Sequence, residues 1–240
     1  MNNFIFPISI GSLEFCIRSR AVCPFTSRRN QPISGPIFAV SARALVPSPP
    51  IALFSVWLVL TFSGMATLWI YSTTPGHQDY APTRWPTFTT LQRASDRCTL
   101  VMFVHPKCPC SRASLDELAA ILAHSGGHLR ADVVFLSPTG EPASWVHTDL
   151  WETALRLPET STISDPAGRQ ARLFHASVSG ETLVYDSLGN LRFHGGITDG
   201  RGHAGDNPGC SAIQTYLNTG TAPTARTPVF GCPLFDDSTP

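Results

Sequence analysis

The hydrophobic pattern of the chain is most informative between residues 98 and 124. Leu100 to Val104 is an unbroken apolar run, which is typical of a strand covered on both faces of a sheet. After Ser111 the period changes, because apolar residues recur three or four positions apart, as on one face of a helix. These residues are Leu115, Leu118, Ala119 and Leu122. The pattern predicts a strand over 98–104 and a helix over 111–124.

The later part of the chain alternates short strand-like and helix-like segments. A strand, a helix and a second strand at this spacing predict a right-handed parallel crossover. The turn letters DSLGN between the last two strands predict a hairpin. The predicted strands are 131–136, 162–165, 182–185 and 191–194, and the predicted helices are 148–156, 166–175 and 206–217. The fold class is therefore α/β with a mixed sheet.

Two helix starts carry capping signals. The first long helix has Ser111 as a candidate N-cap, or Ser114 with Glu117 as a capping box. The closing helix is entered through the letters DNPG, which make Asp206 its simplest N-cap.

Ile51 to Tyr71 contains no charged residue and reads as one transmembrane helix. About 20 helical residues span a bilayer core, and Trp69 and Tyr71 stand where an interfacial aromatic belt is expected. Residues 1–50 hold five arginines and one glutamate, so the positive-inside rule predicts a cytoplasmic N-terminus and a periplasmic C-terminal domain. A cleaved signal peptide is the alternative, although its apolar core is usually about 7–15 residues.

The flanking regions divide the chain further. Residues 1–50 lack a periodic pattern and are expected to be a disordered cytoplasmic tail, or to follow a start codon assigned too far upstream. Residues 72–95 are predicted to be a polar linker, 96–218 the folded domain, and 219–240 a Pro-rich tail. The formal net charge is zero and no basic patch is present, which argues against a nucleic-acid partner.

The candidate chemistry lies in the turn between the first strand and the first long helix. Cys108 and Cys110 stand there, at the positive end of the helix, where free amides and the helix dipole favour a thiolate. Lys107 adds a nearby positive charge. The chain has seven cysteines, and an odd number leaves room for a working pair and at least one spare thiol.

This order of strand, cysteine turn, helix and second apolar strand resembles the thioredoxin fold. The letters HPKCPCS, GGITDGRGHAGDNPG and VFGCPL more narrowly resemble the membrane-anchored RedB-type and TlpA-like branch of the thioredoxin-like superfamily. The resemblance covers roughly residues 90–234 and implies a three-layer domain, a central mixed sheet flanked by helices, after one transmembrane helix. It also implies a thiol–disulfide oxidoreductase that acts on a protein thiol or redox partner and needs no cofactor.

The resemblance assigns roles within the turn. Cys108 aligns with the attacking thiolate, Cys110 is the nearest resolving thiol, and Ser111 occupies the aligned second position. His105 and Lys107 are expected to tune the thiolate. A C-x-C pair closes only a small, strained ring. The alternatives are that Cys232 or Cys210 resolves Cys108, or that no residue of the same chain does.

The family topology also predicts the surroundings of the turn. The last strand returns toward the cysteines and delivers the loop over 195–209 beside them. Candidate neighbours of Cys108 are therefore His194, His203, Asp206 and Cys210. Cys98 is excluded, because it lies at the other end of the first strand, about 20 Å away. The cis-proline of thioredoxins is missing at its expected position near Glu181.

A metal site is the alternative function. The short C-x-C spacing and the missing proline favour it, since cysteine and imidazole ligands suit copper(I) or zinc. The candidate ligands are Cys108, Cys110 and His203, with Cys232 or Cys210 as a further ligand.

Overall fold

The computed structural model describes residues 49–222 and 225–235, so most of the N-terminal region discussed above lies outside the described residues. The first described element is helix α1 (Pro49–Thr73). Its segment Pro50–Thr73 is long and apolar enough to cross a membrane, by length and composition. A signal sequence has the same properties, and the orientation of the helix across a membrane stays a prediction.

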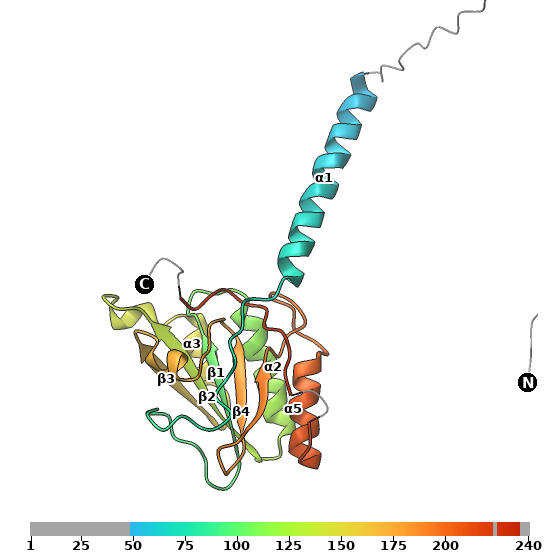
Figure 1. Ribbon diagram of the computed structural model, residues 1–240. Coiled ribbons are helices and arrows are strands. Elements are labelled where there is room, and N and C mark those ends of the chain that lie inside the picture. Colours follow the sequence, from blue (N-terminus) through green and yellow to red (C-terminus); the bar gives the residue numbers. More distant parts are fainter. Residues whose placement is uncertain (1–48, 223–224, 236–240) are drawn as a thin grey trace, which may run out of the picture. The chain divides into compact units, whose positions relative to one another are not determined.

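The domain is built on one five-stranded mixed sheet (Figure 1). Its strands run in the order β3-β2-β1-β4-β5, with β1, β2 and β3 parallel and with β4 and β5 antiparallel to their neighbours. The strands are β1 (Cys98–Val104), β2 (Leu129–Ser137), β3 (Thr160–Pro166), β4 (Glu181–Tyr185) and β5 (Leu191–Gly195). This arrangement is the thioredoxin-like fold that the sequence predicts.

Helices cover both faces of the sheet and complete three layers. One face packs against α2 (Ser111–His124), α3 (Asp149–Leu155) and α5 (Pro208–Thr219), and the other against α4 (Arg169–Leu173) and the segment before β1. A short 3-10 helix, Ala143–Trp145, precedes α3. Side chains of β1 alternate between the two cores, with Met102 on the first face and Phe103 on the second. Burial on both faces explains why the strand is apolar throughout.

The predicted linker over 72–95 packs on the domain in its second half. Leu91 is buried, and the Trp85 ring lies 5.2 Å from the rings of both Phe174 and Tyr185. The backbone carbonyl of Thr83 accepts a hydrogen bond from the amide of Leu191, the first residue of β5, at 2.9 Å. Because Leu91 is buried and Trp85 is partly buried against two aromatic rings, this half of the segment packs as part of the second core.

Both predicted helix caps are wrong. The N-cap of α2 is Cys110, without a side-chain hydrogen bond, because backbone bonds within the cysteine turn already begin the helix. Glu117 bonds instead to the loop before α5, where it accepts from the amide of Gly205. The N-cap of α5 is Asn207, whose side chain accepts from the amide of Cys210 at 2.8 Å.

Helix α4 is shorter than the predicted helix over 166–175. Ala167 and Gly168 have positive φ angles of 57° and 64°, so the chain turns before the helix begins. The buried carboxylate of Asp165 then accepts hydrogen bonds from the amides of Gln170 and Ala171, both at 2.9 Å. This side chain replaces the backbone partners that the first helical amides lack.

Candidate functional site

The cysteine turn is shaped by backbone hydrogen bonds. After β1 the chain reverses, and the amide of Cys108 donates to the carbonyl of His105 at 3.0 Å. The amide of Ser111 then donates to the carbonyl of Cys108 at 3.2 Å, where α2 begins. Cys108 is only 2% exposed, whereas Cys110 is partly exposed. The turn therefore buries the first cysteine and leaves the second closer to the surface.

A segment that follows α5 brings a third cysteine to this turn. Residues 229–234 run beside the loop that precedes β4, and the amide of Ser179 donates to the carbonyl of Cys232 at 2.8 Å. The amide of Leu234 donates to the carbonyl of Ser177, also at 2.8 Å. Val229 and Leu234 are buried and anchor the segment. The predicted Pro-rich tail is thus part of the site.

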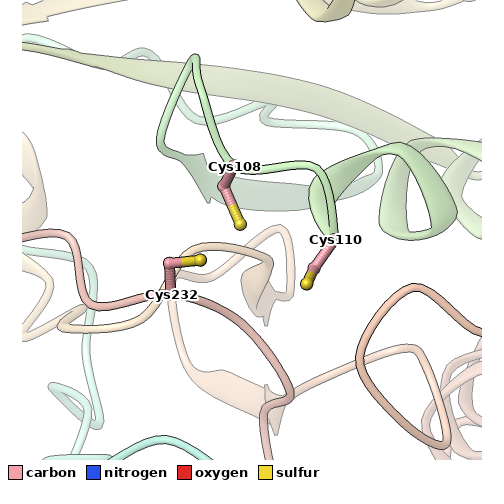
Figure 2. A group of neighbouring side chains, drawn as sticks. All are labelled: Cys108, Cys110 and Cys232. Atoms are coloured by element: carbon pink, nitrogen blue, oxygen red, sulfur yellow. The ribbon is translucent and has the colours of Figure 1, made fainter. Parts of the chain in front are cut away.

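The three cysteines form one compact cluster (Figure 2). The sulfur atoms of Cys108, Cys110 and Cys232 all lie within 4.8 Å of one another, and their side chains point toward a common centre. All three are free thiols. A disulfide bond is about 2 Å long, so side-chain movements of less than about 3 Å are enough to form one. The cluster can therefore hold a dithiol, a disulfide with a spare thiol, or a soft metal ion.

The local environment gives the three thiols different pKa values. Burial raises the pKa of the Cys108 thiol, but hydrogen bonds from the backbone and thiol of Cys232 and from the Ser111 hydroxyl outweigh it, so this pKa lies below its usual value. Burial and the neighbouring Cys108 raise the pKa of Cys110. Burial and a hydrogen bond to Cys108 raise the pKa of Cys232 to about 12. Cys108 is therefore the thiol most readily ionised in the cluster.

Arg201 is a site residue that the sequence analysis did not identify. Its guanidinium hydrogen-bonds to the sulfur of Cys110 and to the carbonyl of Gly231. Its positive charge partly offsets the rise in the pKa of both Cys110 and Cys232. It belongs to the loop over 195–209, which was predicted to lie beside the cysteines. A lone arginine in a Gly-rich loop gives no periodic or spacing signal, so only the folded arrangement identifies it.

Two of the predicted supporting residues, Lys107 and His105, contact the Trp145 ring. The ammonium group of Lys107 lies 4.5 Å from the centre of the Trp145 ring. The His105 ring stands edge-on to the same tryptophan at 5.4 Å, and its Nδ1 accepts from the amide of Lys107 at 3.2 Å. These contacts shape the outer side of the turn.

Ser111 contacts Cys108 through its hydroxyl. Its hydroxyl lies 2.7 Å from the hydroxyl of Ser179, and the Ser179 hydroxyl also accepts from the amide of His105 at 2.7 Å. The buried pair of serines therefore joins the cysteine turn to the loop that holds the Cys232 segment. Ser111 is both a hydrogen-bond donor to the Cys108 sulfur and a part of this joint.

The remaining candidates lie elsewhere. His203 is exposed and its Nδ1 is 3.0 Å from the carbonyl of Arg201. Cys210 bonds to the carboxylate of Glu117 at 3.2 Å, and burial raises its pKa to about 12. Neither residue belongs to the sulfur cluster, which is the only group of three or more candidate metal ligands among the described residues. Asp206 is exposed within the loop over 195–209. Cys98 stands at the opposite end of β1 from the turn.

The position of the missing cis-proline is filled by polar groups. None of the peptide bonds in the described residues is cis. The loop before β4 is instead stabilised by the buried Glu181, whose carboxylate accepts from the amides of Ser177 and Val178 at 2.9 and 3.1 Å. The same carboxylate pairs with the buried His194 at 2.5 Å. His194 thus supports the loop and the segment that follows α5, whose residue Ala225 accepts from its amide at 2.9 Å.

Comparisons with known proteins support the fold and leave the chemistry open. No protein-family model matches this chain, and no curated protein matches it. A hypothetical protein from Sinorhizobium meliloti 1021 is 18% identical, with a TM-score of 0.50 over 70% of this chain and 97% of its own. An uncharacterised conserved protein from Geobacillus kaustophilus is 16% identical, with a TM-score of 0.50 over 70% of this chain and 95% of its own.

A secreted disulfide oxidoreductase from Mycobacterium tuberculosis is 10% identical, with a TM-score of 0.37 over 51% of this chain and 81% of its own. A likeness at that level does not carry a function across. The order and direction of its strands give the chain a thioredoxin-like fold.

Proposed function

We propose that this protein carries out thiol–disulfide exchange and that its working disulfide joins Cys108 to Cys232. The observation that carries the proposal is the placement of three thiols within 4.8 Å of one another on a thioredoxin-like frame. The thiolate is the form of a cysteine that exchanges, and the lowered pKa of Cys108 favours it. A disulfide between Cys108 and Cys110 would close only a small ring and would be strained, which favours Cys232 as the partner.

The proposed setting is the outer side of a membrane. Helix α1 acts as an uncleaved anchor, and the arginine-rich region before it faces the cytoplasm, so the domain lies in the periplasm. Such a compartment permits disulfides to persist. The protein then belongs to the RedB-type and TlpA-like branch that its cysteine-turn motif resembles, and its partner is a protein thiol.

Binding of a soft metal ion is the second candidate function of the same cluster. Three sulfur ligands at about 2.3 Å from one ion lie about 4 Å apart, which agrees with the grouping of the three sulfur atoms within 4.8 Å. Thiolates select copper(I) or zinc. The absence of a fourth cysteine, histidine or carboxylate from this group in the described residues favours three-coordinate copper(I) over tetrahedral zinc.

One titration separates the two functions. The full-length protein, in detergent, is equilibrated with glutathione buffers of graded potential, with and without a copper(I) chelator, and its disulfides are mapped by peptide mass. A reversible two-electron couple between Cys108 and Cys232 that the chelator does not change supports thiol exchange. Thiols that react only after chelation, with stoichiometric release of copper or zinc, support the metal site instead. A Cys98→Ser variant is the matched control, because this thiol lies at the other end of β1.

A further inference from the structure

The two sulfur atoms of the proposed disulfide are not equally accessible. Cys108 belongs to the turn between β1 and α2 and is only 2% exposed. Cys232 is partly exposed, and the next residue, Pro233, is exposed. Exchange begins when a thiolate approaches one of the two sulfurs, and access decides which sulfur it reaches. Geometry therefore singles out Cys232.

We propose that a redox partner forms its mixed disulfide with Cys232, and that Cys108 is the buried leaving group. This inference rests on the proposed thiol–disulfide exchange. It reverses the assignment that the resemblance implies, in which Cys108 meets the partner directly. The partner-facing residue would then stand on a segment after the last helix, and not on the turn between β1 and α2.

The exchange balances with a partner that carries two thiols. The first partner thiolate attacks the sulfur of Cys232, so the bond between Cys232 and Cys108 breaks and Cys108 leaves as a thiolate. The second partner thiolate attacks the partner sulfur of the mixed disulfide, and Cys232 leaves and takes up a proton. The partner loses two electrons and becomes a disulfide, while the site gains them as the Cys108 thiolate and the Cys232 thiol. A protein disulfide or glutathione disulfide restores the oxidised site by the reverse steps.

The surroundings of Cys108 suit a leaving group. The Ser111 hydroxyl and the backbone amide of Cys110 both hydrogen-bond to its sulfur, and both belong to the turn and helix start, so they remain in place after Cys232 has bonded to the partner. Hydrogen bonds to a leaving sulfur stabilise the thiolate as it forms. Exposure and leaving-group stability thus point to the same direction of attack.

The segment also keeps the mixed disulfide at the site. Backbone bonds from Ser179 to the carbonyl of Cys232 and from Leu234 to Ser177 hold the chain just after the reacting side chain, and Arg201 binds the carbonyl of Gly231 just before it. Cys108 consequently stays close enough to resolve the mixed disulfide in the reverse direction. Cys110 lies within the same 4.8 Å and is a second internal attacker, which a trapping experiment must remove.

The test follows the position of glutathione, used as a small probe thiol. Full-length protein in detergent is oxidised with glutathione disulfide, freed of reagent, pulsed with reduced glutathione for a short time and quenched in acid. Released thiols are then labelled with N-ethylmaleimide in denaturant and mapped by peptide mass. We expect glutathione on Cys232 and maleimide on Cys108, with at least about tenfold more adduct on Cys232 than on Cys108.

A variant strengthens the assignment. In Cys108→Ser/Cys110→Ser no internal thiol of the cluster can displace the probe, so glutathione added as its disulfide should remain on Cys232. The Cys98→Ser protein is the control and should behave as the wild type. Glutathione found mainly on Cys108 in the pulsed wild type would overturn this inference while leaving the proposed exchange intact. A wild type that never forms the Cys108–Cys232 disulfide would overturn the proposed function itself.

Discussion

Gly231 lies against the backbone carbonyl of Ser179, so closely that a Cβ atom at residue 231 would overlap the carbonyl oxygen. The two residues belong to the neighbouring chain segments that bring Cys232 over the cysteine turn. Only glycine permits this approach of one backbone to another. The close contact therefore controls whether the third cysteine reaches the cluster.

Gly231→Ala should separate Cys232 from the other two cysteines. The methyl group cannot be accommodated without moving the segment, since its neighbour is backbone and not a flexible side chain. We expect a loss of about 1–3 kcal/mol in the free energy of unfolding and a loss of the Cys108–Cys232 disulfide under conditions in which the wild type forms it. Urea unfolding and peptide mapping measure both effects. Pro233→Ala, an exposed change in the same segment, is the control, and an unaltered disulfide in Gly231→Ala would contradict the prediction.

Arg201→Gln should slow the reaction of Cys110. The guanidinium lowers the pKa of this thiol by its charge and by a hydrogen bond, against the raising effect of burial. Its loss reduces the thiolate fraction, so alkylation of Cys110 by iodoacetamide at pH 8 should slow about threefold to tenfold. Arg201→Lys should restore part of the rate. Arg112→Gln, which removes an exposed ion pair with Asp149, is the matched control and should leave the rate unchanged.

Ser179→Ala should weaken both the fold and the Cys108 thiolate. The substitution removes a buried acceptor from the amide of His105 and the partner of the Ser111 hydroxyl. We expect a loss of about 1–3 kcal/mol in urea unfolding, because two buried polar groups lose a partner. The pH profile of Cys108 alkylation should move to higher pH, since Ser111 is no longer held in place. Ser177→Ala, whose hydroxyl contacts an exposed carbonyl, should show neither effect.

Asp186 gives a pH-dependent prediction away from the cysteines. Burial raises the pKa of its carboxyl, but hydrogen bonds from Asn190 and the charge of Arg192 outweigh this and lower it to about 2. An unfolded aspartate has a pKa of about 3.9. A pKa lowered in the folded state stabilises the fold above about pH 4, and this contribution is lost as the pH falls through about 2. Asp186→Asn should therefore destabilise the protein by about 1–3 kcal/mol at pH 7.

The difference between Asp186→Asn and the wild type should shrink as the pH is lowered from 4 toward 2, in urea unfolding followed at each pH. Parallel stability curves over this range would show that the carboxylate does not stabilise the β4–β5 turn through its charge. Glu141→Gln, on the loop between β2 and the 3-10 helix, is a suitable exposed control.

Local patterns were enough to predict much of the fold. The apolar run at Leu100 and the helical period after Ser111 gave the bounds of β1 and α2 as the structure has them. The parallel crossover and the closing hairpin were also predicted from strand spacing and turn residues, and the resemblance to the thioredoxin fold implied the mixed sheet. The two caps were wrong, since a capping motif in the sequence competes with backbone turns that are visible only in the fold. In α5, Asn207 acts as the cap, one residue after the predicted Asp206.

The full candidate site was not predictable in the same way. Cys108 and Cys110 are neighbours in the sequence, and the strand-to-helix turn identifies them. Cys232 was named only as an alternative to Cys210, because it reaches the turn through backbone pairing with a loop more than 50 residues earlier, and such pairing has no signature in side-chain periodicity. Arg201 was missed for the same reason. Trp85 and Leu91 were predicted to lie in a linker, because two isolated apolar residues among prolines do not form a period.

The pairing of residues 229–234 with the loop before β4 has a consequence for biosynthesis. Every strand of the sheet and helix α5 precede Cys232 in the chain, so the ribosome completes the frame before it adds the third sulfur. A chain synthesised only as far as α5 holds two of the three clustered cysteines, Cys108 and Cys110, and Cys108 then lacks the hydrogen bonds that Cys232 supplies. The proposed Cys108–Cys232 disulfide therefore forms only after the domain that positions it has been made.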